Sequence, residues 1–328
     1  MERGGAVSAD NRLYELTGKR VWVAGHNGMV GSALVRRLQS EGCDVVYAPR
    51  SELDLTRQDD VALWMERTRP HAVFVAAAKA GGILANDRFP ADFLCENLMI
   101  ETSIIRAAWK TGVEKLLFLG SSCIYPRLAE QPIAESALLT GPLEPTNEWY
   151  AIAKIAGIKL CAAFKRQHGC NFISAMPSNL YGPGDNYDLQ TSHVIPALIR
   201  KAHDAKIRSD RELVIWGTGD PRREFLHVDD CADALVLVMT CYEDEEHINI
   251  GCGEDLPIYD LACLVATVVG FRGAIVCDPS KPDGVSRKLV DSGKLRALGW
   301  KPRMPLREGI ASTYQEFLKT YSGELQTP

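Results

Sequence analysis

The 328-residue chain lacks the features that assign proteins to membranes, to secretion or to metal-binding modules. Its apolar runs fall short of the roughly 20 residues that span a bilayer, and residues 1–18 contain no apolar core of a signal peptide. Its ten cysteines form no CxxC pair, so neither a zinc site nor a disulfide framework is expected. These absences predict a metal-free protein of the reducing cytoplasm.

An excess of positive charge is also missing. The chain has 37 lysines and arginines against 42 aspartates and glutamates, which gives a formal net charge of -5. Nucleic acids and anionic membranes attract basic surfaces, so we expect neither as a partner. Length and composition fit a soluble enzyme with one large domain and a lobe, or with two domains.

Near its N-terminus the chain does have a glycine-rich turn. Gly25, Gly28 and Gly31 follow the apolar run 21–24 and precede the amphipathic stretch 32–38. A strand, a glycine turn and a helix in this order are typical of a dinucleotide-binding site. Gly25 would allow the tight turn, Gly28 the approach of a pyrophosphate to the helix N-terminus, and Gly31 the packing of helix on strand. A glycine-rich turn that binds nothing is the alternative.

A second pattern, Tyr150-Ala-Ile-Ala-Lys154, puts a phenol and an ammonium one helical turn apart on the same face. We expect Lys154 to lower the pKa of Tyr150 from about 10, so that the phenol can exchange a proton with a sugar oxygen. The spacing alone is common on helices. The glycine turn, which predicts a redox cofactor, gives it more weight.

The end of the second predicted strand bears on the choice of nicotinamide cofactor. A carboxylate there would bind the ribose 2′-hydroxyl of NAD, whereas an arginine suits the 2′-phosphate of NADP. Residues 45–47 run into Arg50, a bidentate phosphate donor, with no carboxylate at that point. Asp54, in Leu-Asp-Leu, is better placed to contact adenine. The sequence therefore favours NADP(H), and a solvated Arg50 is the alternative.

Short apolar runs and amphipathic stretches alternate along the first half of the chain. We predict strands at 20–25, 44–48, 72–77, 115–120 and 171–176, and helices near 29–41, 58–68, 97–112 and 150–167. This alternation predicts an α/β fold with a Rossmann-type doubly wound parallel sheet, covered on both faces. Beyond residue 178, Pro/Gly-rich loops interrupt the pattern, so we expect a smaller, discontinuous C-terminal substrate lobe.

Several segments together resemble the extended short-chain dehydrogenase/reductases that act on nucleotide sugars. Examples are Leu-Gly-Ser-Ser-Cys-Ile-Tyr-Pro at 119–126 and Arg-Glu-Phe-Leu-His-Val-Asp-Asp at 223–230. The other segments are 24–32, 76–83, 144–157, 192–198 and 280–284. The resemblance goes as far as the branch that converts GDP-4-keto-6-deoxy-D-mannose to GDP-L-fucose. It implies C3/C5 epimerisation through enolates, followed by NADPH-dependent reduction of the C4 ketone.

The resemblance also implies which residues bind each ligand. For NADP(H) they are Gly25, His26, Asn27, Gly28, Met29, Val30, Gly31, Arg50, Asp54, Leu55, Leu119, Gly120, Ser121, Ser122, Tyr150, Lys154, Pro177, Ser178, Asn179, Leu180 and His193. For the GDP-sugar they are Ser122, Asn179, Lys201, Trp216, Arg223, Lys281 and Asp283. The predicted division is a flexible lead-in at 1–17, an NADP-binding Rossmann domain at 18–180 with about 222–250, a GDP-sugar-binding lobe at about 181–221 and 251–322, and a tail at 323–328.

The chemistry of the candidate catalytic residues is consistent with this reaction. Epimerisation beside a ketone needs a base, an opposing acid and donors to the enolate oxygen. We predict Cys123 as the base, His193 as the acid, and Ser121 and Tyr150 as the donors. Cys123 lies two residues past Ser121 in a segment expected to be extended, so both side chains would point to one side. The related sugar dehydratases carry an Asp-Glu pair at this place, so dehydration is not expected.

Two other functions remain open. One is another nucleotide-sugar epimerase or 4-reductase of the same family with a retained cofactor. The other is a non-catalytic dinucleotide sensor, against which the intact Ser121, Tyr150 and Lys154 argue. We also expect a homodimer, because helices near 97–112 and 150–167 carry apolar faces that one sheet face would not cover. The family commonly pairs these helices as a four-helix bundle.

Overall fold

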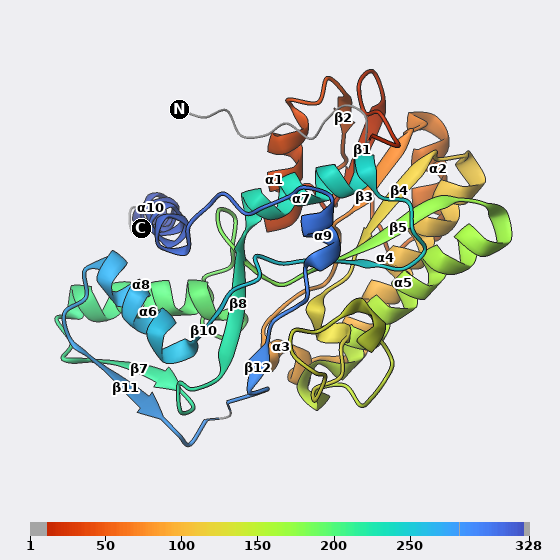
Figure 1. Cartoon of the computed structure of the whole chain (residues 1–328). Coiled ribbons are helices and arrows are strands. Elements are labelled where there is room, and N and C mark those ends of the chain that lie inside the picture. Colours follow the sequence, from red (N-terminus) through yellow and green to blue (C-terminus); the bar gives the residue numbers. More distant parts are fainter. Residues whose placement is uncertain (1–11, 282, 325–328) are drawn as a thin grey trace.

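A six-stranded parallel sheet forms the centre of the computed structural model, which describes residues 12–281 and 283–324 (Figure 1). The strand order is β2-β1-β3-β4-β5-β9, and every neighbouring pair in it is parallel. The bounds are β1 Arg20–Ala24, β2 Asp44–Val46, β3 Ala72–Val75, β4 Lys115–Leu119, β5 Asn171–Pro177 and β9 Ile248–Ile250. The five strands predicted in the first half are confirmed, with ends that differ by one or two residues.

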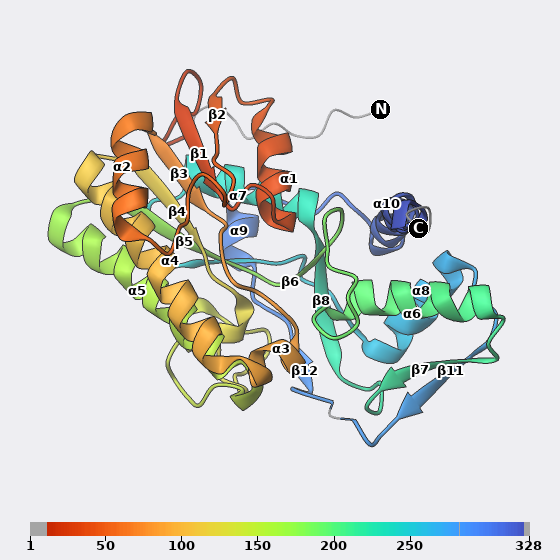
Figure 2. The same ribbon diagram turned by 180° about the vertical axis from the view of Figure 1, so that it is seen from behind.

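Helices cover both faces of this sheet (Figure 2). On one face lie α1 (Met29–Leu38) and α7 (Val228–Cys241), with a core that includes Leu34 and Leu235. On the other lie α2 (Gln58–Thr68), α4 (Pro90–Thr111) and α5 (Glu148–His168), with a core that includes Ile104 and Ile158. The Rossmann-type fold predicted from the alternation of strands and helices is therefore confirmed.

Strand order reverses direction at β1, which has β2 on one side and β3 on the other. In open α/β sheets a crevice opens at such a switch point, beyond the carboxyl ends of the strands. The segments that follow β1 and β3, at Gly25 and Ala76, therefore meet at the place where a ligand is expected.

The second half of the chain adds two smaller sheets. In one, β8 (Arg222–His227) pairs with β6 (Asn179–Tyr181), β10 (Asp255–Pro257) and β12 (Arg287–Lys288). In the other, β7 (Glu212–Trp216) pairs with β11 (Ala274–Asp278). The helices α6 (Val194–Arg208), α8 (Ile258–Val269) and α10 (Leu306–Glu324) share a third hydrophobic core beside them. Short helices at α3 (Ile83–Arg88), α9 (Gly293–Ala297), η2 (Ser122–Ile124), η3 (Glu135–Ala137) and η4 (Pro145–Asn147) complete the fold.

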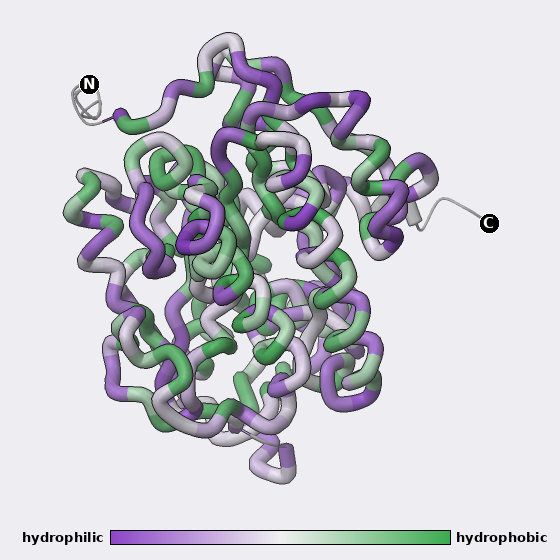
Figure 3. Tube along the Cα trace, turned by 90° about the vertical axis from the view of Figure 1, so that its right-hand side faces the viewer, coloured by the Kyte–Doolittle hydropathy of each residue, from purple (hydrophilic) through white to green (hydrophobic). Residues whose placement is uncertain are grey.

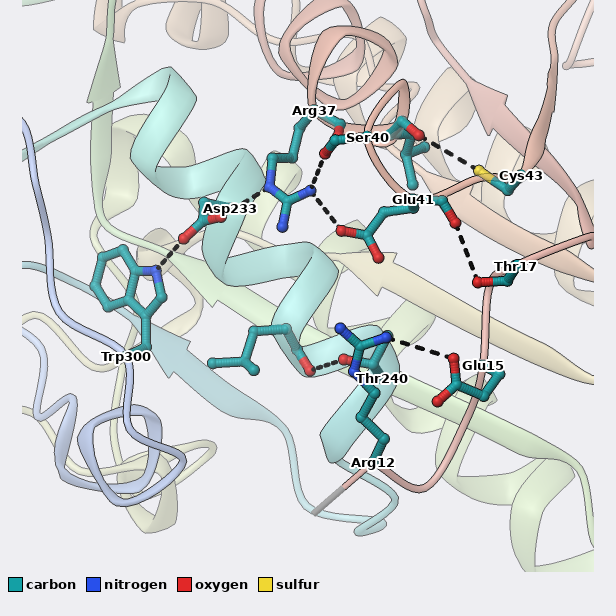
Figure 4. A network of polar contacts seen from close by, with 12 residues as sticks. Arg12, Glu15, Thr17, Arg37, Ser40, Glu41, Cys43, Asp233, Thr240 and Trp300 are labelled. Carbon is teal, nitrogen blue, oxygen red and sulfur yellow. Dashed lines mark hydrogen bonds and ion pairs between the residues drawn. The ribbon is translucent and has the colours of Figure 1, made fainter. Parts of the chain in front are cut away.

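The predicted flexible lead-in is wrong for residues 12–17. The backbone N–H groups of Leu13 and Tyr14 donate to the Thr240 carbonyl, and Leu16 is buried, so this segment is packed onto α7. Figure 4 shows Thr240 beside Arg12. The remaining predicted lead-in, 1–11, and residues 325–328 of the predicted tail lie outside the described residues.

Polar contacts tie α1 to α7 and to the segment after α9 (Figure 4). Arg37 donates to Asp233 over 2.7 Å and to Glu41 over 2.6 Å, and Trp300 Nε1 donates to the other oxygen of Asp233. Figure 3 shows hydrophobic stretches running through the middle of the molecule, with hydrophilic ones toward the outside. In the described ranges no helix has both the length and the apolar character needed to cross a membrane.

Candidate active site

The glycine turn lies between β1 and α1, at the switch point of the sheet. Gly25 has φ +88°, and a Cβ there would lie 2.6 Å from the backbone nitrogen of Ala77, after β3. At Gly31 a Cβ would lie 2.0 Å from the Gly25 carbonyl oxygen. A Cβ on Gly28 would meet no atom closer than the Gly25 carbonyl oxygen at 3.4 Å, which is an ordinary contact. The fold therefore requires glycine at positions 25 and 31, whereas at position 28 it would tolerate a side chain.

The start of α1 suits a phosphate. Gly28 is its N-cap, and no side chain caps the helix, so the first backbone N–H groups remain available to an anion. Arg50 is exposed after β2, as a 2′-phosphate donor must be. The imidazole of His26 stacks on Tyr47 with ring centroids 4.4 Å apart, and this contact restrains the His26 side chain beside the turn. These residues fit a dinucleotide phosphate.

Asp54 is engaged in a local turn, whereas Asn27 is exposed. Asp54 Oδ1 accepts hydrogen bonds from the backbone N–H and the hydroxyl of Thr56, over 3.0 and 2.7 Å. These bonds, more than the nearby charge of Arg50, lower the pKa of Asp54. One carboxylate oxygen therefore holds a local turn, and only the other is open to adenine. Asn27 is exposed at the mouth of the turn.

Lys154 and Tyr150 come together at the base of the site, as their spacing predicts. Lys154 is only 2% exposed, and its Nζ donates to the Leu119 carbonyl over 3.1 Å. The ammonium lies 4.6 Å from the centroid of the Phe118 ring and 5.9 Å from that of Tyr150. Leu119 ends β4, so the sheet itself positions the lysine. Phe93 of α4 contacts the Tyr150 ring edge-on, which fixes the phenol from the other side.

The expected lowering of the Tyr150 pKa is wrong for the protein alone. Burial raises the pKa of the phenol above its ordinary value, and nearby Cys123 and Glu101 raise it further. Burial also lowers the pKa of Lys154, so its ammonium is itself poorly tolerated there. The desolvation of both groups outweighs their mutual attraction. Tyr150 is therefore held in its protonated form, the form that can donate a proton.

The segment after β4 is a tight turn rather than the extended chain expected. Ser121 is extended, but residues 122–124 form the 3-10 helix η2, and the backbone N–H of Cys123 donates to Ser121 Oγ over 3.4 Å. The Ser121 side chain thus caps the turn that carries Cys123, as serine often does. The turn keeps the two side chains close, and Cys123 is 7% exposed. This local cap bends the chain, which is why the segment is not extended as predicted.

Glu101 is a neighbour of Lys154 that was not predicted from the sequence. It lies on α4 and is 2% exposed, and among the described residues neither carboxylate oxygen has a hydrogen-bond partner. A Cβ on Gly157 of α5 would lie 2.9 Å from Glu101 Oε2 and 2.4 Å from Phe118 Cζ, so this glycine makes room for the carboxylate. Burial raises the pKa of Glu101 to about 8, although the charge of Lys154 opposes the rise. A glutamate within the apolar stretch 98–105 of α4 was the available signal.

His193 is the N-cap of α6, at the start of a helix as predicted. Its side chain reaches solvent yet is crowded by protein, and this desolvation lowers its pKa below 6.5. The backbone of Gly82 approaches the preceding residue so closely that a Cβ there would lie 2.7 Å from the Ser192 carbonyl oxygen. No hydrogen bond within the described chain joins His193 to Cys123 or Tyr150. A further histidine, His227, caps α7 by accepting from the Asp229 N–H over 3.3 Å.

Three of the predicted substrate residues form one cluster around an indole. Trp216 ends β7 and is 42% exposed, so it is not a core residue. Lys201 Nζ lies 5.4 Å and Lys281 Nζ 5.8 Å from its ring. Two cations over an exposed aromatic ring form a surface that can bind an anionic, ring-containing ligand.

Asp283 and Arg223 lie near this cluster. Asp283 accepts from the backbone N–H and the hydroxyl of Thr218, over 2.7 and 3.0 Å. Arg223 on β8 is desolvated, which lowers its pKa, while the charges of Asp283 and Glu144 act in the opposite direction. Asn179 begins β6 and donates to the Glu224 carbonyl over 2.8 Å. The predicted residues therefore converge on the edge where β8 faces the end of β7.

The other predicted cofactor residues lie along the carboxyl ends of the central strands or beside them. Gly120 follows β4, and a Cβ there would lie 2.2 Å from the sulfur of Met176 on β5. Pro177 ends β5, and the buried Ser178 hydroxyl after it has no hydrogen-bond partner in residues 12–281 and 283–324. The remaining predicted contacts are Met29, Val30, Leu55, Ser122 and Leu180.

Comparison with known proteins agrees with this geometry. The pattern of the NAD dependent epimerase/dehydratase family matches residues 21–251. A GDP-L-fucose synthase of Sinorhizobium fredii (strain NBRC 101917 / NGR234) is 60% identical over 306 residues, which are 93% of this chain and 98% of that protein. One from Escherichia coli (strain K12) is 52% identical over 311 residues, covering 92% and 97%.

A solved structure is also similar. It is a GDP-L-fucose synthetase from Naegleria fowleri bound to NADP, with a TM-score of 0.87 and 28% identity, covering 96% of this chain and 98% of that one. The family pattern matches more than half of the chain, and the two relatives match nearly all of it. The chain therefore belongs to the NAD dependent epimerase/dehydratase family and, within it, to the GDP-L-fucose synthases.

Proposed function

We propose that this protein converts GDP-4-keto-6-deoxy-D-mannose to GDP-L-fucose, by epimerising C3 and C5 and then reducing the C4 ketone with NADPH. One observation carries the proposal most strongly. A thiol, Cys123, lies in the same buried cluster as Tyr150 and Lys154, so a carbon base and a reductase pair share one site. A simple reductase needs only the second of these. The names of the relatives at 60% and 52% identity support the same reaction.

We propose NADP(H) as the cofactor, held by the turn from Gly25 to Gly31 with its pyrophosphate at the start of α1. When bound, NADPH supplies the hydride that reduces the C4 ketone. The exposed Arg50 supports the phosphate-bearing form, as does the NADP in the Naegleria fowleri structure. Lys154 would bind the nicotinamide ribose. Arg50→Ala should weaken binding of NADPH more than binding of NADH, because only the former loses a charge-assisted contact.

Epimerisation requires proton transfer at carbon. In the proposed mechanism the Cys123 thiolate removes the proton next to the ketone, and its electron pair moves to the C4 oxygen as an enolate. Hydroxyls of Ser121 and Tyr150 donate to that oxygen. His193 delivers a proton to the opposite face of the sugar. The raised pKa of Tyr150 keeps the phenol protonated, so it can give its proton to the alkoxide formed on reduction.

The GDP-sugar would lie between the two halves of the chain. We propose that residues 18–180 with about 222–250 bind the cofactor, and that about 181–221 and 251–322 bind the substrate. Lys201, Lys281 and Arg223 supply cations for a diphosphate, and Trp216 supplies a ring for stacking. Asp283 can accept from hydroxyls or guanine. Ser122 and Asn179 would complete the contacts at the sugar.

We propose a homodimer that acts in the cytoplasm. Apolar side chains on α4 and α5, among them Met99 and Ile152, are exposed and would pair as a four-helix bundle. All ten cysteines lie in the described part of the chain as free thiols, which suits a reducing compartment.

The first experiment is to follow NADPH absorbance with GDP-4-keto-6-deoxy-D-mannose and to identify the product sugar by NMR. NADPH oxidation with a GDP-L-fucose product supports both activities. Oxidation with an unepimerised 6-deoxy sugar would leave a 4-reductase and overturn the roles of Cys123 and His193. No oxidation would favour the alternative, an epimerase that retains and recycles its cofactor.

A further inference from the structure

Lys288 is a half-buried lysine with a desolvated ammonium and no role in the proposed reaction. It ends β12, a two-residue strand that pairs with β8, where Lys288 is in register with Arg223. Burial lowers the pKa of its ammonium, and the charge of Arg223 lowers it further. Among the residues described, no hydrogen bond or ion pair engages this ammonium. Desolvation disfavours the charged ammonium, so a group that becomes negative beside it would stabilise it.

Cys123 is the group that lies in position to do so. Lys288 and Cys123 line the same cavity, of about 10 Å³, and Glu144 lines it too. A cavity of this size holds roughly one water molecule. The thiol and the lysine therefore line one space that holds little solvent. With few water molecules around them, two opposite charges interact more strongly than they would in bulk water.

The charges around Cys123 come from several elements. Burial raises the pKa of the thiol, and the largest opposing effect is the charge of Lys288, ahead of the bond to Ser121 and the charge of Lys154. Lys154 is less free to act, because its ammonium donates to the Leu119 carbonyl and also interacts with Glu101. The charge of Cys123 is in turn the largest effect that raises the pKa of Lys288, and the charge of Glu144 also raises it.

We propose that Lys288 is the positioning residue that favours the thiolate of Cys123, the form able to take a proton from carbon. In that step the sulfur gains the proton, the C–H electron pair passes to the carbonyl oxygen as an enolate, and Lys288 stays protonated. The inference rests on the proposed function, since it concerns the base of the epimerisation. The inference adds to the site a residue of β12 that lies 165 positions after Cys123 in the chain (288 − 123).

The test measures the thiolate directly, without substrate. Wild type and Lys288→Met are alkylated with iodoacetamide between about pH 6 and about pH 10, then digested with trypsin and examined by mass spectrometry. The tryptic fragment 116–127 contains Cys123 as its only cysteine, so its alkylation is read apart from the other nine. In Lys288→Met we expect the pH midpoint to rise by about one unit, so that alkylation near neutral pH slows about tenfold.

Two variants make the result specific. Lys288→Arg keeps the charge and should keep the midpoint, whereas Lys301→Met removes an exposed lysine elsewhere and should change nothing. A variant that merely loosened the site would change the alkylation rate at the alkaline plateau and leave the midpoint in place. An unchanged midpoint in Lys288→Met, or a raised midpoint in Lys288→Arg equal to that in Lys288→Met, overturns the proposal.

A second readout separates this inference from the proposed function. Exchange of the C3 and C5 hydrogens with solvent is measured in the same variants. If the alkylation midpoint rises in Lys288→Met and exchange falls with it, recovering at alkaline pH, both ideas stand. If the midpoint rises and exchange is unaffected, Lys288 still pairs with Cys123, but Cys123 is not the base.

Discussion

At the scale of single residues, the environment of Lys154 decides how the site behaves with pH. The ammonium is buried beside Glu101, whose carboxylate has no hydrogen-bond partner within the part of the chain that the structure describes. The pKa of Glu101 rises from 4.5 to about 8, mainly through burial. A raised carboxyl pKa in the folded state means that the folded chain binds more protons than the unfolded chain over this interval. The contribution of Glu101 to stability is therefore fully present below pH 4.5 and is lost as pH rises through about 8.

This loss of stability with rising pH predicts the behaviour of Glu101→Gln, whose side chain cannot ionise. Relative to wild type, the variant should gain roughly 2 kcal/mol of unfolding free energy between about pH 5 and about pH 8. Urea unfolding at the two pH values measures the change. The exposed Glu52→Gln is the control and should follow wild type. A difference between Glu101→Gln and wild type that stays constant with pH would contradict the assignment.

Cys123→Ser separates the two activities proposed for the site. A hydroxyl in place of the thiol has nearly the same size, so NADPH binding should be retained, whereas loss of the base should slow exchange at C3 and C5 by about 10²-fold or more. Exchange is followed by NMR and binding by fluorescence of NADPH. The exposed Cys95→Ser should leave both unchanged. Equal loss of binding and exchange in Cys123→Ser would mean that Cys123 only supports the fold.

At the scale of elements, the glycine turn offers a test that distinguishes packing from ligand binding. A Cβ at position 31 would lie 2.0 Å from the Gly25 carbonyl oxygen, whereas one at position 28 would lie 3.4 Å from it. Gly31→Ala should therefore destabilise the fold by about 1–3 kcal/mol or more, as overpacking does. Gly28→Ala should keep its stability but weaken NADPH binding, because its methyl group occupies the space left for the pyrophosphate. Thermal unfolding and NADPH titration of both variants check this contrast, and equal stability losses would refute it.

The same elements indicate how much a sequence can predict. The strands of the main sheet are short apolar runs, and their alternation with helices identifies them well. The start of α4 was predicted seven residues late (97 − 90), because the helix begins at a proline, a residue that suits a first turn but interrupts a periodic pattern. The turn that bends Cys123 toward Ser121 was missed because a serine cap is a local hydrogen bond, not a periodicity.

Contacts between distant segments were harder still to predict. β12 has two residues, too few to show any alternation, and its position is set by pairing with β8. Only through this pairing does Lys288 line the same cavity as Cys123, so nothing near either residue in sequence signals that they share it. Glu101 shows the same limit, since its depth depends on the absence of a side chain at Gly157 on another helix. The proximity of Tyr150 and Lys154 was predicted correctly because helical spacing alone brings them together.

At the scale of the whole molecule, the outer face of α4 and α5 carries apolar surface that nothing else in the described chain covers. Met99 and Trp109 on α4, with Trp149 and Ile152 on α5, are each between 38% and 43% exposed. Large apolar side chains gathered on one pair of helices mark an interaction surface rather than an ordinary exterior. A second copy of the same helix pair would bury them symmetrically, since a two-fold interface uses the same patch on both subunits.

Met99→Glu with Ile152→Glu should therefore produce a monomer. Each carboxylate would have to be desolvated at the interface and would face its own copy across the two-fold axis, so pairing should be lost at micromolar concentration. Light scattering gives the mass, with Leu128→Glu, a change at a residue 82% exposed on a loop, as the control that stays dimeric. Because α4 and α5 also carry Phe93, Tyr150 and Lys154, the monomer should lose thermal stability and part of its activity along with its partner. Wild type that scatters as a monomer at the same concentration would refute the dimer.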